Sequence, residues 1–273
     1  MATSSEGEQR VAVVTGAARG MGAATARRLA ARGLTVALVD LPLEPQGRVA
    51  EVPGPYQPSS GSDLDEAAAT CHGRGEPHAA DVRDAGAIER VVAEVVDRQG
   101  RLDVVVAAAG AIAGGVPAWE TSDAAWDAMI GVNLTGVFHL VRAAVPHLLA
   151  APEPRSGRFV AVASAAAQSG LPQLAAYTAA KHGVAGLVRA LAAELGPTGV
   201  TANAVAPGST VGPMLDASAA IYGLDSAAAF AESSRIERLI EPDEIAATIE
   251  WLCLDAPGSL TGAILAVDGG FRG

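Results

Sequence analysis

Short apolar runs rich in β-branched residues alternate with Ala/Leu-rich segments along the whole chain. The apolar runs have no polar face, which is typical of parallel strands that are covered on both sides. The longer segments carry apolar residues at the spacing that buries one face of a helix. The predicted strands are Arg10–Thr15, Thr35–Val39, Pro77–Ala80, Val104–Ala107, Arg158–Val162, Val200–Val205 and Ala263–Val267. The predicted helices are Gly20–Arg32, Ser62–Gly73, Ala85–Gln99, Ala124–Leu149, Tyr177–Leu195 and Pro242–Leu254.

This alternation predicts an α/β fold with a doubly wound, seven-stranded parallel sheet and helices on both faces. No repeat or linker divides the 273 residues, so residues 1–273 are expected to form a single domain. Gly33 and Gly196 fit the C-terminal ends of two helices. Ser62 with Asp65 fits a capping box at the start of another helix.

Composition and charge narrow the choice of partners. A formal net charge of −11 argues against nucleic acid and anionic membrane surfaces as partners. Two distant cysteines, Cys71 and Cys253, suggest free thiols in a reducing compartment. The polar N-terminus lacks the pattern of a signal peptide, and we expect a soluble, cytoplasmic protein. The five histidines have no metal-ligand spacing, so no metal site is expected.

A glycine-rich turn joins the first predicted strand to the first helix. Residues 15–22 read TGAARGMG, with the spacing GxxxGxG. Such glycines permit a tight turn close to a pyrophosphate, and the helix N-terminus offers free N–H groups and a positive dipole end. The position between strand and helix favours a dinucleotide site over an ordinary glycine turn. The residues predicted to hold the cofactor here are Gly16, Arg19, Gly20, Met21 and Gly22.

The ends of the second and third strands carry acids. Asp40, followed by Leu41, lies where a carboxylate can accept the hydroxyls of an adenosine ribose and repel a 2′-phosphate, which favours NAD over NADP. Arg19 could attract a 2′-phosphate and opposes that preference. Asp81 and Val82 are predicted to lie beside the adenine, and a helix N-cap is an alternative role for Asp81.

A second group of residues suggests proton transfer to an alcohol. Tyr177 and Lys181 form a YxxxK pair, and positions four apart share one face of a helix. A nearby ammonium favours the phenolate, which can exchange a proton with an alcohol. Ser164 follows a strand and can bond a substrate oxygen. Asn133, a poor helix former inside a helical pattern, suggests a backbone kink or a water site.

Taken together, these pieces resemble the short-chain dehydrogenase/reductase family, whose members have a Rossmann fold, over almost the whole chain. The matching pieces are TGAARGMG, Asp40, Asp81-Val82, Ala107–Gly110, Asn133, Ser164, Tyr177, Lys181, Asn203–Gly208 and Val267–Gly270. The resemblance implies an NAD(P)-dependent oxidoreductase of alcohols and ketones. It implies that Tyr177 is the acid/base and that Lys181 binds the nicotinamide ribose and lowers the pKa of Tyr177. Ser164 would hold the substrate oxygen, Asn133 would support a proton-relay water, and the protein would be a homotetramer with its long helices between subunits.

The chain departs from the family pattern at two places. The family often has Asn-Asn-Ala-Gly where residues 107–110 are all alanine and glycine, so Ala109 and Gly110 are expected to contact the cofactor through their backbone. Gly212 replaces a threonine that usually bonds the nicotinamide carboxamide, and Ser209 or Thr210 is a possible substitute. The predicted nicotinamide end therefore comprises Pro207, Gly208, Ser209 and Thr210.

An insert at residues 42–61 separates Asp40 from the next predicted helix. It contains five prolines, which restrict the backbone and argue against a fully flexible segment. We hypothesise that it folds over the adenosine half of the cofactor through Leu41, Leu43, Val52 and Tyr56, with a flexible surface insertion as the alternative. With this insert the chain resembles the mycofactocin-coupled branch of the family. That resemblance implies a tightly held NAD that a peptide-derived redox carrier re-oxidises in place.

Residues 208–237 are predicted to form a substrate lid. Their apolar side chains suggest a hydrophobic alcohol or ketone, although the same residues could instead pack the lid onto the domain. The sequence thus predicts an NAD-dependent oxidoreductase that interconverts a secondary alcohol and a ketone. An ordinary enzyme with exchangeable NADH is the alternative. A non-catalytic cofactor sensor is less favoured, because Tyr177 and Lys181 are both present.

Overall fold

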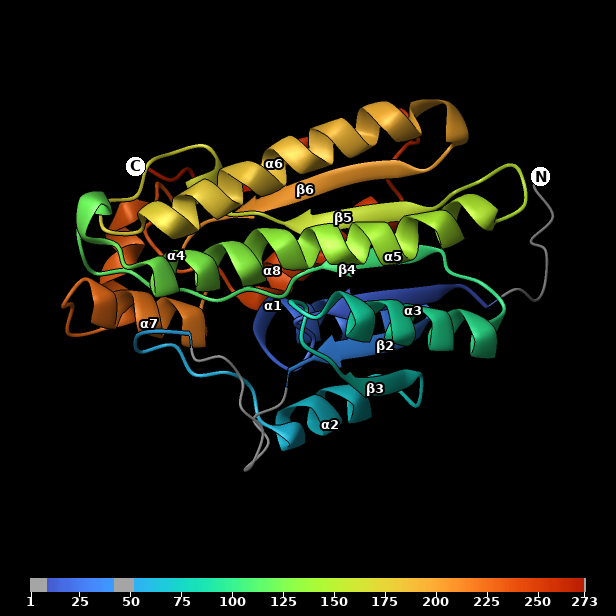
Figure 1. Ribbon diagram of the computed structural model, residues 1–273, viewed down its shortest axis with the longest axis horizontal. Coiled ribbons are helices and arrows are strands. Elements are labelled where there is room, and N and C mark those ends of the chain that lie inside the picture. Colours follow the sequence, from blue (N-terminus) through green and yellow to red (C-terminus); the bar gives the residue numbers. More distant parts are fainter. Residues whose placement is uncertain (1–8, 42–51, 273) are drawn as a thin grey trace.

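The computed structural model describes residues 9–41 and 52–272. Its centre is a seven-stranded parallel sheet with the order β3-β2-β1-β4-β5-β6-β7 (Figure 1), which confirms the predicted fold class. The strands are β1 Val11–Thr15, β2 Thr35–Asp40, β3 Gly75–Ala79, β4 Val104–Ala107, β5 Arg158–Val162, β6 Thr201–Pro207 and β7 Ile264–Val267.

The first strand lies inside the sheet, between β2 and β4, and is buried along its full length. Val13 pairs with Ala37 of β2 on one side and with Val105 of β4 on the other. Because helices cover both faces, neither face of β1 needs polar side chains. The predicted strand at Pro77 begins two residues earlier, at Gly75, and the sixth strand extends to Pro207. In β6, residues 204–207 pair with β7, which keeps the strand regular beyond its predicted end.

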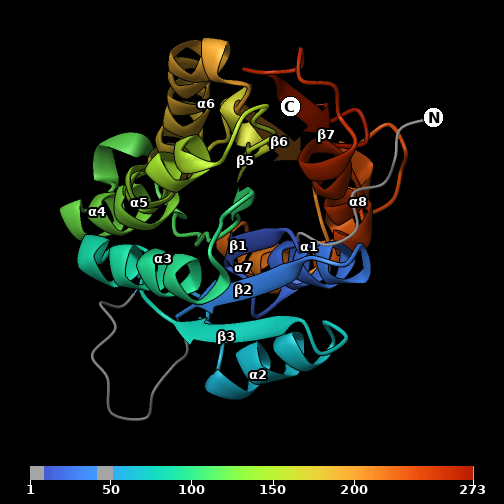
Figure 2. The same cartoon turned by 90° about the vertical axis from the view of Figure 1, so that its right-hand side faces the viewer.

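Helices form a layer on each side of the sheet (Figure 2). One apolar cluster joins α3, α5 and α6 to the sheet, and a second joins α1, α2 and α8 to the opposite face. The α-helices are α1 Gly20–Ala31, α2 Gly61–Ala69, α3 Ala85–Gln99, α4 Asp123–Ile130, α5 Gly136–Ala150, α6 Ala175–Leu195, α7 Pro213–Ile221 and α8 Pro242–Leu254. Short 3-10 segments lie at Ala118–Glu120, Ala165–Ala167, Gly196–Thr198 and Ala227–Ser233.

Two predicted caps lie in a different register. The capping box of α2 is formed by Ser60 and Asp63, so the prediction of Ser62 with Asp65 was wrong by two residues. The N-cap of α3 is Asp84, which accepts from the backbone of Ala87, and the alternative N-cap role for Asp81 is excluded.

The two glycines predicted to end helices, Gly33 and Gly196, have different backbone conformations. Gly33 follows α1 with a left-handed φ of 92°, a conformation that glycine adopts without strain. Gly196 does end α6, but its φ is −43°, and the chain continues from it into a 3-10 turn.

The predicted long helix at Ala124–Leu149 is interrupted in the middle. A π-helical turn, Gly131–Thr135, separates α4 from α5, and the buried Asn133 lies in it, as expected from an asparagine inside a helical pattern. The combined segment Asp123–Ala150 is long and apolar enough to cross a membrane by length and composition alone. Its buried side chains pack on α3 and the sheet, as in the core helix of a folded domain.

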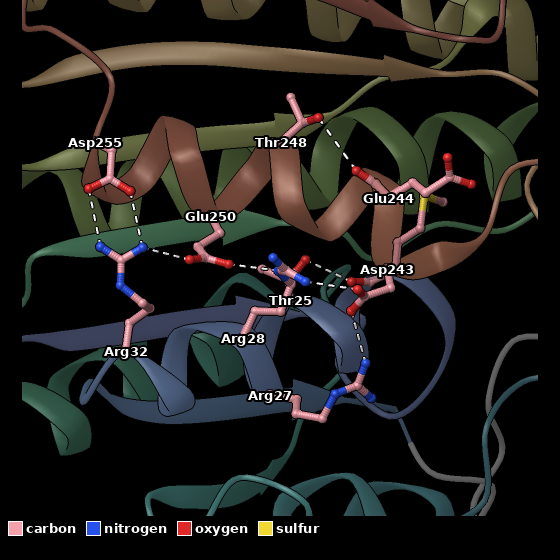
Figure 3. A network of polar contacts seen from close by, with 10 residues as sticks. Thr25, Arg27, Arg28, Arg32, Asp243, Glu244, Thr248, Glu250 and Asp255 are labelled. Carbon is pink, nitrogen blue, oxygen red and sulfur yellow. Dashed lines mark hydrogen bonds and ion pairs between the residues drawn. The ribbon is translucent and has the colours of Figure 1, made fainter.

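An ionic network joins α1 to α8 on the surface (Figure 3). Glu250 lies between two arginines of α1, with its oxygens 2.6 Å from Arg28 Nε and 2.7 Å from Arg32 Nη1. The carboxylate of Glu250 is mostly shielded, with 13% of its side chain exposed. Further pairs link Arg27 and Arg28 to Asp243 and link Arg32 to Asp255. The helix that begins at the glycine-rich turn is thereby attached to the last helix of the chain.

Candidate active site

The glycine-rich turn is a cradle that only glycine can form. Gly16 has a φ of 67°, and a Cβ atom there would lie 2.6 Å from the carbonyl oxygen of Ala108. A Cβ atom on Gly22 would lie 2.0 Å from the carbonyl oxygen of Gly16. The backbone therefore folds back on itself immediately before the N-terminus of α1, where anionic groups bind favourably. This geometry fits the pyrophosphate of a dinucleotide.

A cavity of about 160 Å³ opens beside this cradle, at the carboxyl ends of β1, β2 and β4. Ligands in open α/β sheets bind at this edge. The cavity brings together most of the residues predicted to bind the cofactor: Gly16, Arg19, Gly20, Met21, Gly22, Asp40, Leu41, Asp81, Val82, Ala109, Gly110 and Thr210.

Asp40 is tied to three segments of the chain. Its Oδ2 accepts from the backbone N–H of Ala18 at 2.8 Å, and its Oδ1 accepts from Leu41 at 2.7 Å and from the hydroxyl of Ser59 at 3.0 Å. A carboxylate accepts roughly four hydrogen bonds, so about one position remains for a ribose hydroxyl. With these three bonds in place, the Asp40 carboxylate can accept a hydrogen bond from about one ribose hydroxyl, and not from both as expected from the sequence.

Asp81 lines the cavity, but its carboxylate is bound to Arg83. The Nε of Arg83 lies 3.0 Å from both carboxylate oxygens, and Nη2 lies 2.6 Å from Oδ2. These bonds outweigh burial and hold the pKa of Asp81 below its usual value. Arg83, which also lines the cavity, was not singled out from the sequence, although its position directly after Asp81-Val82 was a signal.

A second cavity of about 300 Å³ adjoins the first, and Met21, Thr210 and Met214 line both. It contains Ser164, Tyr177, Pro207, Gly208 and Ser209, all predicted for the nicotinamide or catalytic end. The rest of its wall is largely apolar and includes Ile112, Leu171, Pro172, Leu174, Leu215, Tyr222, Phe230 and Phe271. The structure thus places the predicted catalytic hydroxyls beside the predicted cofactor cavity.

Tyr177, Lys181 and Ser164 meet at the carboxyl end of β5. Tyr177 and Lys181 lie one turn apart on α6, and Lys181 Nζ is 5.7 Å from the centre of the Tyr177 ring. The ammonium donates to the carbonyl oxygen of Val162 at 2.9 Å, and burial lowers the pKa of Lys181 to about 8. Lys181 is the one lysine in the sequence.

The pKa of Tyr177 differs from the expectation. Burial raises the pKa of the phenol, and a hydrogen bond with Ser164 works in the opposite direction. The predicted lowering by Lys181 is therefore not found for this arrangement of residues. The reason is that Tyr177 as a residue is only 6% exposed, and removing its phenol from water disfavours the phenolate.

Asn133 fastens the π-helical turn to the chain segment that follows β4. Its Nδ2 donates to the carbonyl oxygens of Ala111 and Met129, both at 3.0 Å, and its Oδ1 accepts from the N–H of Ala111 at 3.2 Å. The side chain is fully buried. The predicted kink is confirmed, and the side chain of Asn133 finds its hydrogen-bond partners in α4 and in the segment after β4.

Ser209 and Thr210 both line the substrate side, but their hydroxyls are engaged differently. Thr210 Oγ1 donates to the carbonyl oxygen of Gly208 at 3.1 Å, and Ser209 Oγ lies 3.4 Å from Ser233 Oγ. Gly212, at the family's threonine position, has a φ of 144° and precedes α7. Ser209 is thus the less tightly held of the two candidate substitutes.

The predicted lid folds over the second cavity. It contains α7 and the 3-10 segment Ala227–Ser233, and the rings of Tyr222 and Phe230 meet edge to face with centroids 6.1 Å apart. The Tyr222 hydroxyl donates to the carbonyl oxygen of Pro172 at 2.8 Å, which connects the lid to the opposite wall. Leu171, Pro172 and Leu174 were not predicted as part of the site, and their signal was their position just before Tyr177.

The described part of the insert forms another wall of the first cavity. Val52, Tyr56, Pro58 and Ser59 line it together with lid residues 210–214. Figure 1 shows this segment, in light blue, running beside α7. Val52 and Tyr56 pack against the apolar cluster that contains Tyr177. The insert therefore extends past the adenosine end, while Leu43 lies outside the described residues.

No group of three or more His, Cys, Asp or Glu side chains within residues 9–41 and 52–272 is arranged to hold a metal ion.

Comparison with known proteins gives consistent results. A family model described as enoyl-(acyl carrier protein) reductase matches residues 16–272. An uncharacterised NAD-dependent oxidoreductase of Mycobacterium tuberculosis is 36% identical over 269 residues, covering 96% of this chain and 95% of the relative. The cis-4-hydroxycyclohexanecarboxylate dehydrogenase of Sinomonas cyclohexanicum is 38% identical over 265 residues and 96% of both chains. The crystal structure of carveol dehydrogenase from Mycobacterium avium in complex with NAD matches with a TM-score of 0.87, 33% identity and 96% coverage of both chains.

Proposed function

This chain belongs to the short-chain dehydrogenase/reductase family and is an NAD-dependent oxidoreductase, and on that premise we propose that it interconverts a hydrophobic secondary alcohol and its ketone. The observation that carries the proposal is the junction of two cavities, one lined by the glycine cradle and Asp40 and the other by Ser164 and Tyr177. Because the two cavities share Met21, Thr210 and Met214, an alcohol in the second cavity would lie next to a cofactor in the first.

Each catalytic side chain has a distinct role in this proposal. A bound nicotinamide would supply the acceptor for the hydride of the alcohol carbon. Ser164 holds the substrate oxygen, and Tyr177 as phenolate takes the hydroxyl proton. Lys181 supplies positive charge one helical turn from the phenol and contacts the nicotinamide ribose. Asn133 keeps the π turn in place behind them, and we retain the proposal that it supports a proton-relay water.

The raised pKa of Tyr177 has a consequence for the pH dependence of this step. At neutral pH the buried phenol is protonated, and proton transfer from the alcohol requires the phenolate. The hydrogen bond with Ser164 favours the phenolate, and so does any positive charge that enters the cavity. We therefore expect alcohol oxidation to accelerate with rising pH and ketone reduction to slow.

The walls of the second cavity support an uncharged, apolar substrate. Among the residues that the structure describes, none that lines it is Asp, Glu, Lys, Arg or His. The hydroxyls of Ser218, Tyr222 and Ser233 donate to backbone carbonyl oxygens, so they do not require a partner from the substrate. Carveol, the alcohol in the name of one structural relative, is a substrate of this chemical kind.

We further propose that the insert holds NAD and that a mycofactocin carrier re-oxidises it in place. The support is that Val52, Tyr56 and Ser59 line the cofactor cavity together with lid residues 210–214, so both segments would contact a bound cofactor. In each cycle the alcohol carbon would lose a hydride, which would reach the oxidised carrier by way of NAD. The hydroxyl proton taken by Tyr177 would pass to solvent as the ketone leaves.

The test begins with protein purified without added cofactor. Bound NAD that survives desalting, and alcohol oxidation with a dye acceptor but without free NAD, are the expected results. Multiple turnovers with free NADH and a ketone would instead establish the ordinary enzyme with exchangeable cofactor. Tyr177→Phe is expected to retain NAD and lose turnover, and substantial activity in that variant would overturn the catalytic assignment.

We also propose a homotetramer in the cytoplasm. Exposed aromatic side chains on α4 and α5, Trp126 and Phe138, are 44% and 46% exposed and offer an apolar surface to a second subunit. Cys71 and Cys253 are buried free thiols, consistent with a reducing compartment. Light scattering on the purified protein tests the tetramer, and a monomeric mass would overturn it.

A further inference from the structure

The insert contacts both residues that bear on the choice between NAD and NADP. The two cofactors differ by a phosphate on the 2′-oxygen of the adenosine ribose. Asp40 repels that phosphate, whereas the guanidinium of Arg19 in the glycine-rich turn attracts it. On charge alone these two side chains favour different cofactors, and both line the same cavity.

Ser59 holds the carboxylate of Asp40 in place. It is 4% exposed, and its Oγ lies 3.0 Å from Asp40 Oδ1 and 3.3 Å from the carbonyl oxygen of Leu41. Together with the N–H groups of Ala18 and Leu41, this hydroxyl holds the carboxylate in one orientation. The remaining acceptor position suits a ribose hydroxyl, which donates a proton, and not a 2′-phosphate dianion, which has none to donate.

The same segment also contacts Arg19. Arg19 Nη2 donates to the backbone carbonyl oxygen of Gln57 at 2.7 Å. The guanidinium also lies beside Tyr56, where it opposes the rise that burial causes in the pKa of the phenol. Part of the donor edge of Arg19 is therefore directed to the insert, and a 2′-phosphate would have to displace Gln57 to use it.

We propose that residues 56–59 are the cofactor-selectivity element of this chain. They direct Arg19 away from the ribose and hold Asp40 toward it, so that the cavity accepts a 2′-hydroxyl and rejects a 2′-phosphate. The selectivity for NAD then comes from the insert as well as from Asp40. This role is independent of how NAD is re-oxidised and of which alcohol is the substrate.

The test compares the dissociation constants of NAD⁺ and NADP⁺ by calorimetry on protein freed of nucleotide. The double variant Tyr56→Ala/Ser59→Ala removes the hydroxyl on Asp40 and the ring beside Arg19. Its preference for NAD⁺ over NADP⁺ should fall about tenfold, the equivalent of one charge-assisted hydrogen bond. Ser62→Ala changes an exposed serine in the first turn of α2 that bonds Ser60 and not Asp40, and it should leave the preference unchanged.

Adding Arg19→Ala distinguishes two reasons why the double variant could bind NADP⁺ better. One is that the guanidinium of Arg19 is released toward the phosphate, and the other is that the site is generally loosened. In the double variant Arg19→Ala should remove most of the gained NADP⁺ affinity, whereas with the intact insert its effect on NADP⁺ should be several-fold smaller. An unchanged cofactor preference in the double variant would overturn the proposal, and so would an equal effect of Arg19→Ala in both backgrounds. If circular dichroism shows that the double variant does not fold, Ser59→Ala alone decides the matter by the same ratio.

Discussion

Replacing Lys181 by methionine should change how the stability of this fold depends on pH. The side chain is 3% exposed, and burial lowers its pKa from 10.5 to about 8. Below pH 8 the amine is charged in both the folded and unfolded states, and the folded state bears the desolvation cost. Between about 8 and 10.5 the folded amine is neutral while the unfolded one is still protonated, so stability rises with pH. Each pH unit of that window contributes about 1.36 kcal/mol, which amounts to about 3 kcal/mol.

The assay is urea unfolding of nucleotide-free protein, followed by circular dichroism from pH 7 to 10.5. The quantity of interest is the free energy of unfolding of the wild type minus that of Lys181→Met. We expect this difference to rise by about 3 kcal/mol across the window. The variant lacks the hydrogen bond from Lys181 to the carbonyl oxygen of Val162 at every pH. This loss changes the free-energy difference by a constant amount and does not change its dependence on pH. Tyrosines and cysteines titrate in both proteins and cancel. A difference that stays flat would refute the reasoning that burial sets the charge of Lys181.

Other changes should affect the fold and the cofactor site separately. Asn133→Ala removes three buried hydrogen bonds and should cost about 3 kcal/mol in urea unfolding; a loss below about 1 kcal/mol would contradict its fastening role. Gly22→Ala should abolish NAD binding in calorimetry, because its Cβ would lie 2.0 Å from Gly16, whereas Gly186→Ala, with open space around it, should bind NAD normally. Glu250→Gln should cost about 1–2 kcal/mol, and the cost should shrink in high salt; a salt-independent loss would indicate packing and not charge.

Much of the architecture could be predicted from the chain itself. The strands follow from short apolar runs. The glycine spacing locates the cofactor end because backbone geometry at Gly16 and Gly22 excludes any side chain, and Asp40 lines the same cavity. The position of Asn133 inside a helical pattern also indicated the kink, since asparagine is unfavourable in a regular helix.

The predictions that were wrong concern features that depend on tertiary contacts between residues distant in the sequence. Ser60 with Asp63 and Ser62 with Asp65 have the same local pattern, so the sequence cannot distinguish the two capping registers. The structure selects the first, in which Leu64 is buried and Ser59 reaches Asp40. The pKa of Tyr177 was predicted from one neighbouring charge, whereas the larger effect is burial by residues distant in the chain. The insert's hold on Arg19 likewise depends on the backbone carbonyl of Gln57, which has no side-chain signature.

The attachment of α1 to α8 has a consequence for the order in which the molecule can be built during translation. Apolar residues of α8 such as Ile245, Ile249 and Leu252 are buried in the same cluster as Leu29 of α1. While a ribosome is still making residues 32–241, the outer face of α1 has no α8 to cover it. A nascent chain at this stage exposes apolar surface, which promotes aggregation and chaperone binding. The glycine-rich turn is thus synthesised well before α8, but the helix that it begins is packed in place only when α8 has been made.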